Sequence, residues 1–193
     1  MEVIYPGDLL VFRLHLFQSV LSFHSYMQLA IKPSPIAGNG VFTTGGIKKS
    51  QLIHVVTGEL CTLEEVLHRV EMGVEAAADP LGVEEEKYLD LDELSRTFNH
   101  SCAPNAYIRG KNELMALRDI RSGEEITYDY STTMNDNEEK IIKYGNEMWT
   151  CACHCGSADC RGIIDQFKNV PESTQKFYLR NRYAPDFILN EFS

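Results

Sequence analysis

Polar groups are crowded into residues 96–105, and this stretch constrains the chain more than any other. Its functional groups are a guanidinium, two amides, an imidazole and a thiol, carried by Arg96, Asn99, His100, Cys102 and Asn105. Apolar side chains at Phe98, Ala106 and Ile108 predict that the stretch is largely buried. Buried polar groups need partners, so the crowding indicates a ligand or a metal ion nearby. An asparagine-rich loop with one incidental thiol is the alternative.

Three further motifs accompany this stretch. Residues 38–42 read Gly-Asn-Gly-Val-Phe, residues 123–130 read Gly-Glu-Glu-Ile-Thr-Tyr-Asp-Tyr, and residues 153–162 read Cys-His-Cys-Gly-Ser-Ala-Asp-Cys-Arg-Gly. In this order, the motifs resemble those of SET-domain protein-lysine methyltransferases that carry a post-SET segment. The resemblance runs from about residue 28 to about residue 164, and it is specific because all the motifs occur in the family's order.

The resemblance implies a mainly β fold: a SET-domain fold of short curved sheets with a pseudoknot and few helices, plus a zinc-bound post-SET segment. In that knot the Asn99 segment threads under a loop. A chain of 193 residues with 44% hydrophobic residues suits one domain. We expect the following parts: an N-terminal flank (1–27), the SET domain (28–132), a linker (133–150), the post-SET zinc segment (151–166) and a C-terminal helical tail (167–193).

Local patterns predict the β elements. Glycine and proline turns separate apolar runs, which predicts strands over residues 28–31, 40–43, 51–57 and 125–130. A hairpin is expected where residues 106–109 and 114–118 flank a Gly-Lys-Asn turn.

Helical signals are fewer. Residues 62–72 are expected to form a helix, because Thr62 and Glu65 make a capping box. A short helix is expected over 136–144 and a final helix over 171–183. The acidic residues 79–92 are predicted to be a solvated loop, with substrate docking as the alternative.

A glycine pair is expected beside the cofactor. Methyl transfer from S-adenosylmethionine to a lysine amine is an in-line displacement, so alignment and electrostatics do most of the work. Gly38 and Gly40 lack side chains and let the backbone approach a flat, polar molecule closely. A plain β-turn is the alternative.

The resemblance assigns the cofactor to these residues: Gly38, Asn39, Gly40, Arg96, Asn99 and His100. In the family, the last two bind through an amide side chain and backbone groups. Arg96 occupies the position near the cofactor's carboxylate, where a guanidinium is chemically sensible. A surface ion pair of Arg96 with Asp92 or Glu93 is the alternative.

Two tyrosines are the expected catalytic residues. Tyr130 matches the family's catalytic tyrosine, whose hydroxyl orients the amine. Tyr128 lies two residues earlier, so its side chain is expected on the same sheet face. Its hydroxyl takes up room beside the amine, which predicts mainly mono- or dimethylation. For either tyrosine, a purely structural place in the core is the alternative.

A structural zinc ion is implied by the cysteines. A closed site with four thiolates is structural rather than catalytic, and the resemblance assigns it to Cys102, Cys153, Cys155 and Cys160. The register is ambiguous because Cys151 also makes a Cys-x-Cys pair with Cys153, and His154 is a spare candidate. Cys61 is expected to be a buried thiol.

Two departures from the family pattern motivate another function. Val56 stands where the family often has a channel tyrosine, and Ile163 follows Cys-Arg-Gly where an aromatic residue is common. Packing over the adenine would then come from elsewhere, for example Phe167. The alternative to an enzyme is a SET-fold protein-binding module with little or no activity.

The formal net charge of −10 argues against non-specific nucleic-acid binding and fits a basic partner such as a histone or another lysine-rich segment. Ordinary solubility charge is the alternative. Metal-like spacing of the cysteines favours a reducing, intracellular setting, nucleus or cytoplasm. Residues 9–23 are apolar but include Arg13 and are shorter than the roughly 20 residues of a spanning helix. We therefore expect no membrane anchor, and the sequence leaves the oligomeric state open.

Overall fold

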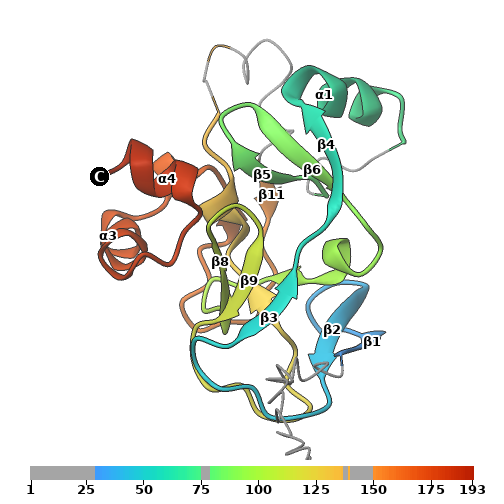
Figure 1. The fold of residues 1–193 in the computed structure, drawn as a ribbon, viewed down its shortest axis with the longest axis vertical. Coiled ribbons are helices and arrows are strands. Elements are labelled where there is room, and N and C mark those ends of the chain that lie inside the picture. Colours follow the sequence, from blue (N-terminus) through green and yellow to red (C-terminus); the bar gives the residue numbers. More distant parts are fainter. Residues whose placement is uncertain (1–28, 75–78, 137–138, 140–149) are drawn as a thin grey trace, which may run out of the picture.

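Figure 1 shows the computed structural model of the chain, which describes residues 29–74, 79–136, 139 and 150–193. Short strands dominate its central part. In chain order they are β1 (Leu29–Pro33), β2 (Asn39–Thr43), β3 (Leu52–Val55), β4 (Gly58–Thr62), β5 (Leu81–Glu84), β6 (Lys87–Leu91), β7 (Asn99–His100), β8 (Ala106–Arg109), β9 (Glu113–Ala116), β10 (Thr127–Tyr128), β11 (Cys151–Ala152) and β12 (Ile163–Ile164). The predicted mainly β fold with few helices is confirmed.

These strands form small sheets rather than one large sheet. Three-stranded sheets have the orders β3-β9-β8 and β4-β6-β5, and β1 pairs with β2 as a hairpin. In Figure 1 this hairpin lies at one end of the molecule and α1 (Leu63–Glu71) at the other. The main core fills the space between the sheets, and Val41, Ile108, Leu114 and Ile126 are fully buried in it.

Pairing of β7 with β10 brings two of the sequence motifs together. The two strands are parallel, with Asn99 opposite Thr127 and His100 opposite Tyr128. Parallel neighbours need a long connection, and here β8, β9 and the following turn provide it. Two motifs that are far apart in sequence are thereby hydrogen-bonded side by side. Threading of this segment under a loop stays a prediction.

The capping box correctly located the first helix. Thr62 accepts from the backbone of Glu65, whose side chain accepts from the backbone of Thr62 in return. Leu63, Val66 and Leu67 are buried against the β4–β6 sheet, and Cys61 is buried with them, as expected. The predicted hairpin of β8 and β9 is also confirmed, and Gly110 in its turn has a φ of 62°.

The predicted acidic loop over residues 79–92 is wrong. Apart from a short lead-in, this stretch is the β5–β6 hairpin, whose turn places Glu86 at a φ of 56°. The charges drew attention away from Tyr88 and Leu91, which are buried on opposite faces of β6, Tyr88 with α1 and Leu91 in the main core. Glu84 is neutralised by Lys87 and Lys111 rather than left as a bare charge.

The C-terminal tail contains two helices where one was predicted. The first, α3 (Glu172–Asn181), ends at Arg182 in the left-handed region with a φ of 55°, and α4 (Asp186–Glu191) follows Pro185. Both lie to one side of the β8–β9 hairpin in Figure 1. Short 3-10 helices complete the described backbone: η1 (Ser95–Thr97), η2 (Tyr130–Thr133) and η4 (Phe167–Asn169).

Some predictions concern residues that the structure does not describe. The N-terminal flank (1–27) lies outside the described residues, as does most of the predicted linker helix over 136–144. Strand β10 is shorter than the predicted strand over 125–130, because the chain turns into η2 at Tyr130. Within the described residues, none of the helices has the length and apolar character needed to cross a membrane.

Candidate functional site

Asn99 joins the glycine motif to the 123–130 motif. Its Nδ2 donates to the carbonyl of Asn39 at 2.9 Å and to Glu125 Oε1 at 2.7 Å. The Ser34 hydroxyl donates to the same carboxylate at 2.8 Å. The predicted cofactor residues Gly38, Asn39, Gly40 and Asn99 are therefore neighbours in space, although their binding role stays a prediction.

The two glycines of this motif are required for different reasons. Gly38 has a φ of 44°, and a Cβ built on it would meet nothing within 4 Å, so its backbone faces open space. A Cβ on Gly40 would overlap Glu125 Oε1 and come within 3.1 Å of Asn99 Nδ2. Gly38 thus leaves room for a ligand against the backbone, whereas Gly40 makes room for a carboxylate of the protein. The open side of Gly38 fits the expected cofactor.

The Arg96 guanidinium contacts β6. Its Nε donates to the carbonyl of Leu91 at 2.8 Å, and its terminal nitrogen lies 2.9 Å from Asp90 Oδ1. The ion-pair partner is therefore Asp90 rather than the Asp92 or Glu93 considered from sequence. Contact of Arg96 with a cofactor carboxylate stays a prediction.

Tyr128 and Tyr130 lie together, as their spacing predicted. Their ring centroids are 4.8 Å apart, and the Tyr130 hydroxyl donates to the carbonyl of Phe98 at 2.6 Å. Burial raises the pKa of both phenols, and for Tyr130 nearby Asp79, Cys151 and Glu125 raise it further. Both hydroxyls therefore keep their protons near neutral pH, so they act as hydrogen-bonding groups rather than as phenolates.

The predicted metal-binding thiols converge. Cys102 Sγ and Cys153 Sγ are 3.7 Å apart, close to the edge of a tetrahedron with Zn–S bonds of about 2.3 Å. The ligand atoms of His100, Cys102, Cys153 and Cys155 all lie within 4.8 Å of one another. Cys160 lies against this group, with its Sγ 3.6 Å from the carbonyl of Cys153. The cluster thus contains three of the four predicted thiols, with Cys160 beside it, and adds His100, which sequence reasoning assigned to the cofactor.

Backbone N–H groups prepare these sulfurs for a cation. Cys102 N–H donates to Cys155 Sγ, and Arg161 N–H donates to Cys102 Sγ, both at 3.4 Å. Burial alone would raise the pKa of Cys155, but the backbone N–H groups of Cys102 and Ser157 and the thiols of Cys153 and Cys160 bring it to about 7. Burial and the neighbouring thiols raise the pKa of Cys153. A soft divalent cation would displace its proton, so the donor set fits zinc. Cys151 is exposed on β11.

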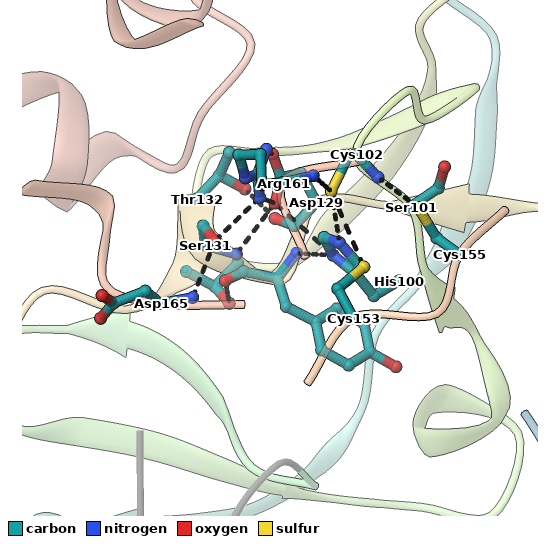
Figure 2. A network of polar contacts seen from close by, with 12 residues as sticks. His100, Ser101, Cys102, Asp129, Ser131, Thr132, Cys153, Cys155, Arg161 and Asp165 are labelled. Carbon is teal, nitrogen blue, oxygen red and sulfur yellow. Dashed lines mark hydrogen bonds and ion pairs between the residues drawn. The ribbon is translucent and has the colours of Figure 1, made fainter. Parts of the chain in front are cut away.

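Asp129 is an unpredicted centre of the site (Figure 2). It is 1% exposed, and the Arg161 guanidinium donates to both of its oxygens at 2.7 Å. The Tyr178 hydroxyl of α3 donates to it at 3.0 Å, and His100 Nδ1 lies 3.5 Å away. One carboxylate therefore connects the cysteine segment, the C-terminal helix and the strand that leads to Tyr130. Its sequence signals were the opposite charges in the motifs Tyr-Asp-Tyr and Cys-Arg-Gly.

Asn105 is a second unpredicted residue of the site. It is buried, its Nδ2 donates to the carbonyl of Glu125 at 2.7 Å, and its Oδ1 accepts from the Thr127 N–H at 2.9 Å. The amide side chain thus hydrogen-bonds the backbone carbonyl of Glu125 and the backbone N–H of Thr127, as a neighbouring strand would. The crowding in residues 96–105 pointed to such a role without specifying it.

Phe167 is enclosed by other side chains of the C-terminal segment. Its ring is fully buried in a C-terminal cluster with Tyr178 and Ile188. Sequence reasoning suggested that Phe167 could pack over an adenine, and the buried ring is not available for that role. Val56 is also buried, and Ile163 is exposed on β12. Neither position therefore supplies the aromatic side chain that the family often has there.

Comparisons with known proteins agree with this geometry. A family model described as the SET domain matches residues 38–131. The chain is 36% identical over 138 residues to the variant-silencing SET domain-containing protein of Plasmodium falciparum (isolate 3D7), covering 62% of this chain and 5% of that protein. It is 31% identical over 151 residues to the H3 lysine-4 specific histone-lysine N-methyltransferase of Schizosaccharomyces pombe, covering 72% of this chain and 15% of that protein. The chain thus spans a small part of these relatives' length.

Solved structures show the same fold. The methyltransferase domain of human histone-lysine N-methyltransferase SETMAR superposes with a TM-score of 0.58 at 21% identity, covering 72% of this chain and 58% of that chain. The family match ends at residue 131, so the post-SET assignment depends on the converging cysteines. Matched residues, fold and relatives agree, and we conclude that this chain contains a SET domain and belongs to the SET-domain family.

Proposed function

We propose that this chain is an S-adenosylmethionine-dependent protein-lysine N-methyltransferase. The observation that carries the proposal is the position of Tyr130, whose ring packs against that of Tyr128 at a tilt of 43° and whose hydroxyl donates to the carbonyl of Phe98. This places a phenol oxygen directly beside the strand that carries Asn99 and His100. Named relatives that are histone-lysine methyltransferases support the same reaction.

The residues of the chain would align the reactants. When bound, S-adenosylmethionine supplies an electrophilic methyl group on a sulfonium. Gly38 and Asn99 would hold it against the β1–β2 turn, where the backbone of Gly38 is open. The Tyr130 hydroxyl donates a hydrogen bond to the carbonyl of Phe98 and keeps oxygen lone pairs that can accept an N–H of the amine and orient it. The buried rings of Tyr128 and Tyr130 would exclude water.

A basic protein substrate suits the electrostatics. Burial first, and then the negative charges of Asp79 and Glu125, raise the pKa of Tyr130, and these two carboxylates would attract a lysine side chain. The whole chain carries a net charge of −10. We propose a histone or a histone-like lysine-rich segment as substrate, in the nucleus or the cytoplasm, where thiols stay reduced.

Two further features belong to the same proposal. A structural zinc ion would be held by Cys102, Cys153, Cys155 and Cys160 and would fix the post-SET segment against β7. The product would be mainly mono- or dimethyllysine, because Tyr128 is 5% exposed and its hydroxyl fills space beside Tyr130.

The test incubates the purified chain with methyl-labelled cofactor and a panel of basic proteins. We expect label on lysine, and a loss of about 100-fold or more in the Tyr130→Phe variant, because the amine is no longer oriented. Mass spectrometry of the product should show one or two methyl groups, and Tyr128→Phe should shift the product toward trimethyllysine. Trimethyllysine as the sole wild-type product would contradict the proposed role of Tyr128.

A SET-fold binding module with little activity is the second candidate. It is favoured by the engagement of Arg96 with Asp90 and Leu91 and by the buried Val56, which leaves the channel without an aromatic wall. Calorimetry with zinc present separates the two candidates. Absence of cofactor binding, together with binding of a basic peptide, would favour the module.

A further inference from the structure

The imidazole of His100 contacts Cys102 through one nitrogen and the backbone of Tyr130 through the other. The backbone N–H of Tyr130 donates to His100 Nδ1 at 3.2 Å. On the other side of the ring, Nε2 is 3.3 Å from Cys102 Sγ. The ring therefore connects a metal-binding thiol to the backbone of the proposed catalytic tyrosine.

Hydrogen bonding decides which nitrogen carries the proton. A backbone N–H can only donate, so Nδ1 must present its lone pair to Tyr130, and the neutral ring carries its hydrogen on Nε2. That hydrogen points to Cys102 Sγ. Asp129 Oδ1 lies 3.5 Å from Nδ1, but both oxygens of Asp129 already accept from Arg161.

The same assignment argues against His100 as a metal ligand. Coordination by Nε2 would require the hydrogen to move to Nδ1, where it would oppose the Tyr130 N–H. Cys160, whose Sγ lies against the carbonyl of Cys153 and accepts from the Gly162 N–H, is then the fourth ligand. His100 remains beside the ligand Cys102 as a hydrogen-bond donor.

Tyr130 is held at both ends by one short segment. Its backbone N–H donates to His100. Its hydroxyl donates to the carbonyl of Phe98, which precedes His100 by two residues. The His100 and Tyr130 rings also meet edge to face, with centroids 5.5 Å apart. A small displacement of the His100 ring would therefore move the phenol relative to the amine.

We propose that His100 is a positioning residue: its Nε2–H donates to the metal-bound sulfur of Cys102, its Nδ1 accepts from Tyr130, and metal binding is thereby coupled to the placement of the catalytic phenol. The kinetic consequence depends on the proposed methyl transfer. The structural coupling does not, and it can be measured without any activity.

Two variants separate the ends of the imidazole. In His100→Gln the amide nitrogen can replace Nε2 as donor to Cys102, while the acceptor for Tyr130 is lost. In His100→Asn the amide oxygen can replace Nδ1 as acceptor, while the donor to sulfur is lost. Thermal unfolding of both, with metal bound, verifies that they are folded.

The first measurement is the absorption spectrum of the cobalt-substituted chain. We expect a four-thiolate spectrum for the wild type and for His100→Gln. His100→Asn should shift the sulfur-to-cobalt charge-transfer band and lose metal to a chelator about tenfold faster or more, as loss of a ligand's outer hydrogen bond does elsewhere. A wild-type spectrum of three sulfurs and one nitrogen would overturn the proposal.

The second measurement follows the Tyr130 amide by NMR in a chain labelled with ¹⁵N-tyrosine, which has nine tyrosines. The Tyr130→Phe variant identifies the resonance. We expect removal of the metal from the wild type to shift it, and His100→Gln to shift it and to weaken its response to the metal. An unchanged wild-type resonance after metal removal overturns the coupling, even if both variants fail to fold. Equal effects of both variants on both measurements would show a packing role only.

Kinetics complete the test. His100→Gln should lower kcat more than it raises KM, because it displaces the phenol rather than the binding surfaces. If the chain transfers no methyl group to any substrate while the NMR coupling holds, the proposed function fails and the role of His100 stands. If the chain transfers methyl groups but the NMR coupling is absent, the proposed function stands and the role of His100 fails.

Discussion

Gly40 shows how one missing methyl group arranges a site. A Cβ there would overlap Glu125, and this carboxylate also receives hydrogen bonds from Ser34 and Asn99. From the sequence pattern Gly-x-Gly, both glycines were expected for the same reason: each would let a cofactor approach the backbone closely. The structure separates them, because only Gly38 faces open space.

Gly40→Ala and Gly38→Ala should therefore have different effects, the first on the side chains around Glu125 and the second on the backbone. Displacement of Glu125 would release Asn99, and we expect at least tenfold weaker cofactor binding by calorimetry, roughly 1.4 kcal/mol or more. Gly38→Ala places an alanine at a φ of 44° and should lower the free energy of unfolding by about 1–2 kcal/mol. Adding Glu125→Ala to Gly40→Ala should recover part of the lost stability. Unchanged binding in Gly40→Ala would contradict this account.

Asp136 supports a prediction with a defined pH dependence. It is 6% exposed, and in the described structure its Oδ2 has no hydrogen-bond partner. Burial raises the pKa of Asp136 above its usual 3.8. A raised folded-state pKa means that the charged form costs stability above that pKa and costs nothing below about 3.8.

Asp136→Asn should thus stabilise the chain at pH 7 by about 1 kcal/mol, with the difference shrinking as the pH falls toward 4. Asp119→Asn is the matched control of opposite sign. Lys48 lowers the pKa of Asp119, so this variant should lose a small stabilisation at pH 7. Urea unfolding at several pH values measures both. A destabilised Asp136→Asn protein at pH 7 would show that the carboxylate has a charge partner.

Among the elements, those with a strong local signal were predicted well. The capping box of α1 and the Gly-Lys-Asn turn between β8 and β9 depend on residues next to each other in sequence. The β5–β6 hairpin was missed because its strands are short and because the acidic run that begins at the end of β5 forms its turn. The break between α3 and α4 was missed although Pro185 marks it.

The pairing of Asp129 with Arg161 fixes the cysteine segment onto the β10–η2 region. Arg161→Met would leave a carboxylate that is 1% exposed without its counter-charge. We expect a loss of about 3–5 kcal/mol in the free energy of unfolding. The double variant with Asp129→Asn should lose less than the sum of the single changes, because no unpaired charge remains. Additive losses in denaturant unfolding would argue against a direct coupling.

Helix α3 is tied to the same carboxylate, which makes the C-terminal tail part of the site. Tyr178→Phe removes only the hydroxyl that donates to Asp129 and should cost about 1–2 kcal/mol. Ser173 of the same helix is exposed, so Ser173→Ala should change stability by less than about 0.5 kcal/mol. Comparable losses in both variants would mean that α3 contributes through packing alone.

At the scale of the whole molecule, sequence order predicted the fold and the convergence of most site residues. Motif resemblance located Asn99, Tyr128, Tyr130 and the cysteines, because each motif keeps its local spacing. The charged motifs and the crowding of residues 96–105 drew attention to Asp129 and Asn105 but did not identify their partners, since a buried ion pair and a backbone clamp depend on tertiary contacts. The engagement of Arg96 with Asp90 was likewise invisible, because β6 was taken for a loop.

Metal removal tests whether these distant parts act as one unit. Cys102 lies beside β7, and the other three thiols lie in the C-terminal segment, so the proposed ion joins residues about fifty positions apart. We expect one zinc per chain, and chelation should lower the melting temperature and free four thiols for a thiol reagent. Because Arg161 donates to both Cys102 and Asp129, chelation should also increase hydrogen exchange in η2. Cys151→Ser should retain the metal, whereas Cys153→Ser should lose it. A chain that unfolds at the same temperature with and without chelator would show that Arg161 and Asp129 hold the segment without help from an ion.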